Sequence, residues 1–95
     1  MFGRCYVEVP LKKYDKIGNC LTTKVYFKHY KTAHIFAYRY TKRNKCFVRI
    51  FEYQPETYEN DFTEGFHWIV SIDNGRICAS WSMTAIELER ILKNG

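Results

Sequence analysis

Alternation of apolar and polar residues predicts short β-strands in the first third of the chain. Residues 4–9 alternate between apolar and polar positions, which is typical of a strand with one buried face, and Pro10 is expected to end it. Residues 12–19 form a basic connection that ends in Gly-Asn turn chemistry. Residues 20–30 alternate again, so we expect a second strand whose outer face carries lysine and tyrosine.

A hairpin is predicted over the next two runs, residues 33–41 and 46–53. Both are dense in β-branched and aromatic residues, which favour strands, and the basic segment 42–45 separates them. A turn centred on this segment would place Tyr40 opposite Phe47.

A second hairpin is indicated by Asn74-Gly75, the preferred pair for a type I′ turn, between two runs of alternating apolar residues. Counting outward from the turn gives the expected cross-strand pairs Asp73 with Arg76, Ile72 with Ile77, Val70 with Ala79, and Trp68 with Trp81. This register places both tryptophans on one buried face.

The C-terminal segment has the pattern of a helix. Thr84 and Glu87 have the spacing of a capping box, and an apolar stripe follows at helical spacing: Ala85, Leu88, Ile91 and Leu92. The expected fold class is therefore α+β, with an antiparallel sheet or partly rolled barrel of five to six strands and one C-terminal helix.

Composition limits the class of protein. The chain has 95 residues, 46% hydrophobic and 18% aromatic, which predicts one small domain over residues 1–95 with a core built from large rings. The N-terminus lacks the apolar core of a signal peptide, and no apolar run approaches the length of a membrane span. We therefore expect a cytoplasmic protein without a membrane partner. Its four cysteines include no Cys-x-x-Cys pair and are expected to be free thiols, with two disulfides as the alternative.

Charge divides the chain into two unlike parts. Residues 1–49 hold twelve Lys and Arg against Glu8 and Asp15, a formal charge of +10, whereas residues 50–95 hold three against eight acids, a charge of −5. A basic half indicates an acidic partner, either a protein surface or a nucleic acid.

Two candidate binding surfaces follow. Basic and aromatic residues alternate in the first half, and cations can neutralise phosphates while rings stack on bases or anchor a protein contact. The residues chosen for this surface are Tyr26, Lys28, Tyr30, Arg43 and Lys45. The alternative surface is an acidic connection that could occupy a partner's nucleic-acid groove, with the residues Glu56, Glu59, Asp61 and Glu64. If neither surface binds, the next candidate binding surface is the polar face of the second hairpin, with His67, Ser71, Arg76 and Ser80.

Signals for catalysis, metals or cofactors are weak. No two of the three histidines have the spacing at which one strand or helix presents paired metal ligands, so no metal and no cofactor are expected. The chain contains no nucleophile elbow and no phosphate-binding glycine-rich loop. A ribonuclease would have to use His34 and His67 as acid and base, with Arg39 or Arg49 stabilising phosphate charge.

The leading hypothesis is a small non-enzymatic binding protein that docks on a host macromolecular machine as an inhibitor. Residues with AT-rich codons outnumber those with GC-rich codons by 39 to 17, a composition common in phages and mobile elements, whose proteins would act in the host cytoplasm. Direct binding of single-stranded DNA or RNA is the alternative, and a small ribonuclease is the third choice.

Overall fold

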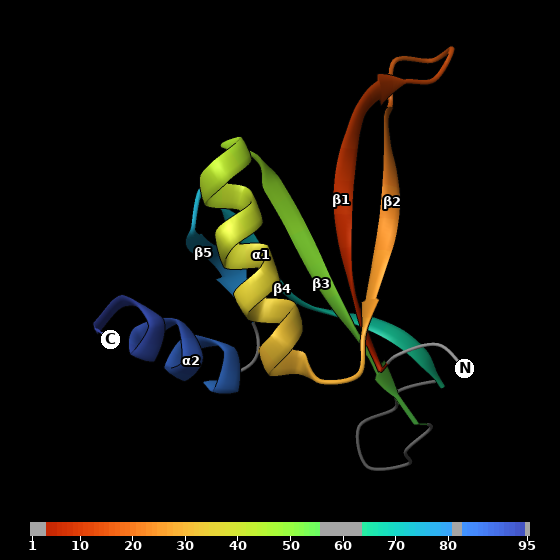
Figure 1. Cartoon of the computed structure of the whole chain (residues 1–95). Helices are drawn as coiled ribbons and strands as arrows, with labels where there is room; N and C mark the ends of the chain where they lie inside the picture. The colour runs from red at the N-terminus through yellow and green to blue at the C-terminus, as the bar shows by residue number, and fades with distance from the viewer. Residues whose placement is uncertain (1–3, 56–63, 81–82, 95) are drawn as a thin grey trace.

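The computed structural model describes residues 4–55, 64–80 and 83–94. This part of the chain forms a five-stranded antiparallel sheet with two helices (Figure 1), in the strand order β2-β1-β3-β4-β5. The elements are β1 (Cys5–Tyr14), β2 (Cys20–Phe27), α1 (Tyr30–Asn44), β3 (Phe47–Gln54), β4 (Gly65–Asp73), β5 (Arg76–Ser80) and α2 (Met83–Asn94). The α+β class, the antiparallel sheet and the C-terminal helix are confirmed. The sheet is open, with β2 and β5 as its edges, and is not a barrel.

The predicted strand over residues 33–41 is wrong, because these residues lie in helix α1. The apolar pattern fits a helix once it is counted at a period of 3.6, since the fully buried residues of α1 are Ala33, His34, Ala37 and Thr41. These side chains lie against the sheet. Phe47, the expected partner of Tyr40, pairs with Asp73 of β4 instead.

Helix α1 carries few of the usual end signals beyond Lys42 and Arg43 in its last turn. Its N-cap, His29, makes no side-chain capping bond, and the first turn has no acidic residue. At the other end Lys45 adopts the left-handed conformation (φ 50°) that glycine most often supplies. Residues 42–45, expected to be a hairpin turn, are the last turn of this helix and its cap.

The core lies between α1 and the adjacent face of the sheet. Val7, Val48, Ile50, Val70 and Ile72 are almost completely buried there. Each buried aliphatic side chain of this size contributes about 1.5–3 kcal/mol.

The Asn74-Gly75 turn has the predicted geometry, with φ of 50° and 77° at its two residues. The pairs Asp73–Arg76 and Ile72–Ile77 are confirmed, but Val70 pairs with Ser80 and not with Ala79. The register shifts because Cys78 is an extra residue in β5.

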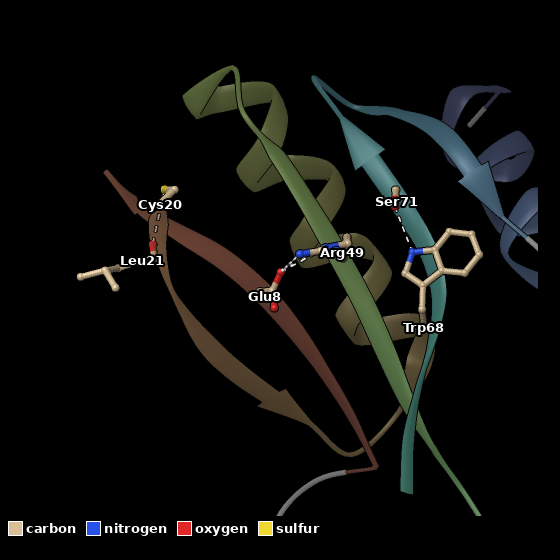
Figure 2. A network of polar contacts seen from close by, with 6 residues as sticks. All are labelled: Glu8, Cys20, Leu21, Arg49, Trp68 and Ser71. Carbon is tan, nitrogen blue, oxygen red and sulfur yellow. Dashed lines mark hydrogen bonds and ion pairs between the residues drawn. The ribbon is translucent and has the colours of Figure 1, made fainter. Parts of the chain in front are cut away.

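A second bulge, at Ile69 in β4, corrects the prediction for Trp68. Ile50 pairs with Val70 but Phe51 pairs with Trp68, so Trp68 lies on the face opposite the core. There its indole Nε1 donates a hydrogen bond to Ser71 Oγ at 2.9 Å (Figure 2). Trp81 lies outside the described residues.

Helix α2 begins at Met83, so Thr84 lies within its first turn and is not the predicted N-cap. Ala85 is buried and Ile91 is 65% exposed, so the expected apolar stripe is only partly covered. The helix lies beside the edge strand β5, where Glu89 Oε1 accepts a hydrogen bond from the Ile77 amide at 2.6 Å. In the described ranges, neither helix is long and apolar enough to cross a bilayer.

Candidate functional site

The structure does not bring the predicted basic-aromatic residues together. Tyr26 lies on the sheet face opposite α1, where its ring packs 5.5 Å from that of Tyr6. Lys28 is exposed between β2 and α1, while Arg43 and Lys45 lie at the far end of α1. These residues therefore do not form one surface.

Tyr30 is half-buried in the first turn of α1 and is part of the interior. Its hydroxyl is hydrogen-bonded to His34 Nδ1 at 2.8 Å, and burial is the largest cause that raises the pKa of Tyr30. The predicted acidic residues Glu56, Glu59 and Asp61 lie outside the described residues. Glu64 is exposed and accepts a hydrogen bond from the Tyr53 hydroxyl.

A different basic-aromatic site is present along α1. An open groove of about 600 Å³ runs between this helix and the end of β2. We call it the α1 groove, and its lining residues are Phe27, Thr32, Ile35, Phe36, Arg39, Tyr40, Arg43 and Asn44. All but Phe27 belong to α1.

Three rings form the apolar wall of the α1 groove. The ring centroids of Phe27 and Phe36 are 5.2 Å apart, and those of Phe36 and Tyr40 are 5.4 Å apart with an interplanar angle of 28°. Phe36 and Tyr40 are one helical turn apart, so the regular helix holds this pair in register.

Two arginines supply the charge of the α1 groove. Arg39 and Arg43 are exposed and also one turn apart, so both guanidinium groups project from the same side of the helix. Neither forms an ion pair with any residue that the structure describes; the ion pair found there joins Arg49 to Glu8. The sequence of α1 contains four cations and no acid, so an anion that neutralises this charge must come from elsewhere in the chain or from a partner.

The face of the sheet opposite α1 carries a second aromatic cluster, which packs against itself. Tyr6 is only 7% exposed, and its ring lies 4.8 Å from Phe51 and 5.1 Å from Phe66. Arg49 on this face is held by Glu8 at 2.7 Å (Figure 2). This cluster therefore explains much of the aromatic content as internal packing and offers few unused groups to a ligand.

The proposed acid-base pair of a ribonuclease does not fit this structure. His34 is completely buried, and burial lowers its pKa to about 4, so it is neutral near pH 7 and out of reach of a substrate. His67 lies on β4 opposite Glu52.

The four cysteines are free thiols. Cys5 is buried beside Glu52, and burial followed by that carboxylate raises the thiol pKa to about 12, which keeps it protonated and unreactive. No group of three or more metal-ligating side chains occurs within the described ranges.

Comparisons with protein-family models, curated proteins and solved structures find no match to this chain.

The sequence analysis missed most of the α1 groove because it interpreted residues 33–41 as a strand and residues 42–45 as a turn. A helical count would have found it, since Thr32, Phe36, Arg39 and Arg43 follow one helical face.

Proposed function

We propose that the protein is a non-enzymatic binding protein that docks on an acidic surface of a protein partner through the α1 groove. One observation carries this proposal: Arg39 and Arg43, unpaired among the described residues, flank a groove walled by three rings. Aromatic and arginine side chains around a concave site are typical of the residues that dominate protein interfaces.

The form of the α1 groove favours a protein side chain over a nucleic-acid base. Its rings already contact each other, and Phe36 and Tyr40 are stacked, so each of these two rings has one face occupied. The groove thus offers an apolar pocket with a charged rim, as expected for an apolar anchor flanked by Asp or Glu. Each charge-assisted hydrogen bond from an arginine to such a carboxylate contributes about 1.5–3 kcal/mol.

A peptide-display selection on the purified protein tests this proposal and does not require the partner to be identified first. We expect it to recover peptides that combine apolar residues with Asp or Glu. Binding of a recovered, fluorescently labelled peptide is then measured by anisotropy. The double variant Arg39→Glu, Arg43→Glu should weaken it by about tenfold or more.

The matched control is Lys31→Glu, Lys45→Glu, which changes the net charge equally at exposed positions outside the α1 groove. This control should retain affinity within about threefold. Equal losses in the two double variants would assign the binding to general electrostatics and overturn the proposal, as would a selection that yields no acidic peptides.

Direct binding of single-stranded nucleic acid is the second candidate, favoured by the four cations and absence of acids in α1. It predicts that a labelled oligonucleotide binds with an affinity that falls steeply and log-linearly with salt, and that Arg39→Glu with Arg43→Glu abolishes binding. Under the first proposal, the α1 groove retains no single-stranded oligonucleotide at about 150 mM salt, so Arg39→Glu with Arg43→Glu leaves any residual retention of the single strand unchanged.

The finer form of the proposal is an inhibitor of a host macromolecular machine in the cytoplasm. Its support is the sequence composition, together with the exposed arginines and the rings of the α1 groove. A partner identified with the peptides above would decide that form through its own activity assay.

A further inference from the structure

A second surface lies on the hairpin formed by β1 and β2, and this surface shares no residue with the α1 groove. Every residue from 11 to 24 is exposed, although the first half of β1 is buried. Figure 1 shows these strands projecting from the rest of the sheet, and β1 pairs with β3 only over Cys5–Glu8. We call residues 11–24 the arm.

The arm presents apolar and basic side chains together. Tyr14 is 68% exposed and Ile17 is 86% exposed at its tip, with Leu11 and Leu21 further back. Its charged residues are Lys12, Lys13, Lys16, Lys24 and one acid, Asp15, which gives a net charge of +3.

The carboxylate of Asp15 binds backbone amides of the turn at the tip of the arm. Among the described residues it forms no ion pair with a lysine. Its Oδ1 accepts hydrogen bonds from the amides of Ile17 at 2.9 Å and Asn19 at 2.8 Å. These bonds order the turn and lower the pKa of Asp15. The arm is thus a pre-formed ribbon, although a two-stranded hairpin without further packing is only marginally stable in water.

A bulge shapes the ribbon. Pro10 pairs with Thr22 and Tyr14 with Cys20, so three residues of β1 oppose one of β2, and Lys12 takes a positive φ of 58°. Such a bulge bends the strand and increases its right-handed twist.

We propose that the arm inserts into the major groove of double-stranded DNA. The major groove of B-form DNA is about 12 Å wide and admits a two-stranded β-ribbon. In this arrangement the lysines contact the phosphates, and Tyr14 and Ile17 contact base edges such as the thymine methyl group. The major groove of an RNA duplex is too deep and narrow for side chains to read, so the proposal is specific to DNA.

Charge argues against a second copy of this chain as the occupant. A contact between two arms would bring together two ribbons of net charge +3. Such like-charge contact is unfavourable, whereas DNA supplies a dense array of negative charge.

Fluorescence anisotropy with three labelled probes tests the proposal: a DNA duplex of about 20 base pairs, an RNA duplex of the same sequence, and the single DNA strand. We expect the DNA duplex to bind about tenfold tighter than either other probe. Between about 50 and 200 mM salt, the triple variant Lys12→Gln, Lys13→Gln, Lys16→Gln should reduce the steepness of log K against log salt by about 2–3.

The control Lys28→Gln, Lys31→Gln, Lys45→Gln removes the same charge from exposed positions outside the arm and should keep the parental slope. Tyr14→Ser with Ile17→Ser should lower affinity without changing the slope. Thermal unfolding of each variant verifies that the body is folded.

Equal or tighter binding of the RNA duplex or the single strand would overturn the proposal, and so would no binding at about 50 mM salt. A concentration-dependent dimer that Ile17→Ser abolishes would assign the arm to a second copy instead. The inference does not depend on the α1 groove, because no residue of the arm lines that groove.

Discussion

At the scale of single residues, His34 shows how burial fixes a protonation state. It is completely buried between α1 and the sheet, Nδ1 is bonded to the Tyr30 hydroxyl, and Nε2 has no hydrogen-bond partner among the described residues. A second proton would add charge to a side chain that is shielded from solvent, so burial lowers its pKa from 6.5 to about 4.

This shift predicts a loss of stability in mild acid. The folded-state pKa lies below the unfolded-state value, so only the unfolded chain gains a proton as the pH falls from about 6.5 to 4. Between pH 7 and pH 5 the parent should lose about 2 kcal/mol more of its free energy of unfolding than His34→Gln does. Urea unfolding at both pH values measures the difference. The exposed-site variant His29→Gln should behave as the parent does, and an equal pH dependence in all three proteins would contradict the prediction.

Thr41 joins α1 to the β4–β5 turn. Its buried Oγ1 accepts a hydrogen bond from the Gly75 amide at 2.9 Å and donates one to the Tyr38 carbonyl at 3.2 Å. Thr41→Val keeps the volume but leaves the buried Gly75 amide without its acceptor, so we expect a loss of about 2 kcal/mol. Thr41→Ser retains the hydroxyl and should lose only about 1 kcal/mol. Chemical unfolding compares the two, and equal losses would show that the hydrogen bond contributes nothing.

At the scale of elements, α1 shows where local preference misled the sequence reasoning. Its tyrosines, phenylalanine and threonines favour strands, and its ends have neither a side-chain N-cap hydrogen bond nor a C-terminal glycine. The side that packs on the sheet nevertheless repeats at helical spacing, through Ala33, Ala37 and Thr41. Tertiary packing of this side outweighs the weak propensity of its residues.

The Asn74-Gly75 hairpin shows the opposite case. Both residues need a positive φ, which few side chains tolerate, so this turn could be predicted locally. The bulges at Ile69 and Cys78 could not, because pairing with neighbouring strands decides where an extra residue lies. The α1 groove was missed for a different reason: all of its lining residues but Phe27 lie on α1, a segment that was interpreted as a strand and a turn.

Two glycines in comparable conformations provide a test of how stability is distributed. Gly75 has φ +77° and Gly18, at the tip of the arm, has φ +94°. A Cβ added at Gly75 meets only ordinary van der Waals contacts, and one added at Gly18 meets no atom within 4 Å. The cost of each alanine substitution therefore comes from backbone strain and not from a steric clash. Gly75→Ala should destabilise the protein by about 1 kcal/mol. Gly18→Ala should leave the unfolding midpoint unchanged, because the tip of the arm is exposed on all sides of Gly18 and can open locally. Equal losses would show that the arm unfolds together with the body.

At the scale of the whole molecule, the two halves of the charge pattern occupy different elements. The basic half builds β1, β2 and α1, which contain both the arm and the α1 groove, while the acidic half contributes β4, β5 and α2. A field of this kind orients a charged partner before contact. The radius of gyration is 13.9 Å, whereas a compact chain of this length has about 12.4 Å. A projecting arm is expected to raise the radius of gyration above the compact value.

Removing the arm tests whether it is an appendage of an otherwise self-sufficient body. Replacing residues 11–21 with Asn-Gly connects Pro10 to Thr22, which already face each other across the two strands. The deleted residues are all exposed, so the free energy of unfolding should stay within about 1 kcal/mol of the parent value. Small-angle scattering should show the radius of gyration falling by about 1–2 Å. The shortened protein should bind the selected acidic peptides through the α1 groove with the parental affinity. Its affinity for the DNA duplex should be lost. If the shortened protein is unfolded, the arm is required for the stability of the body and is not an appendage.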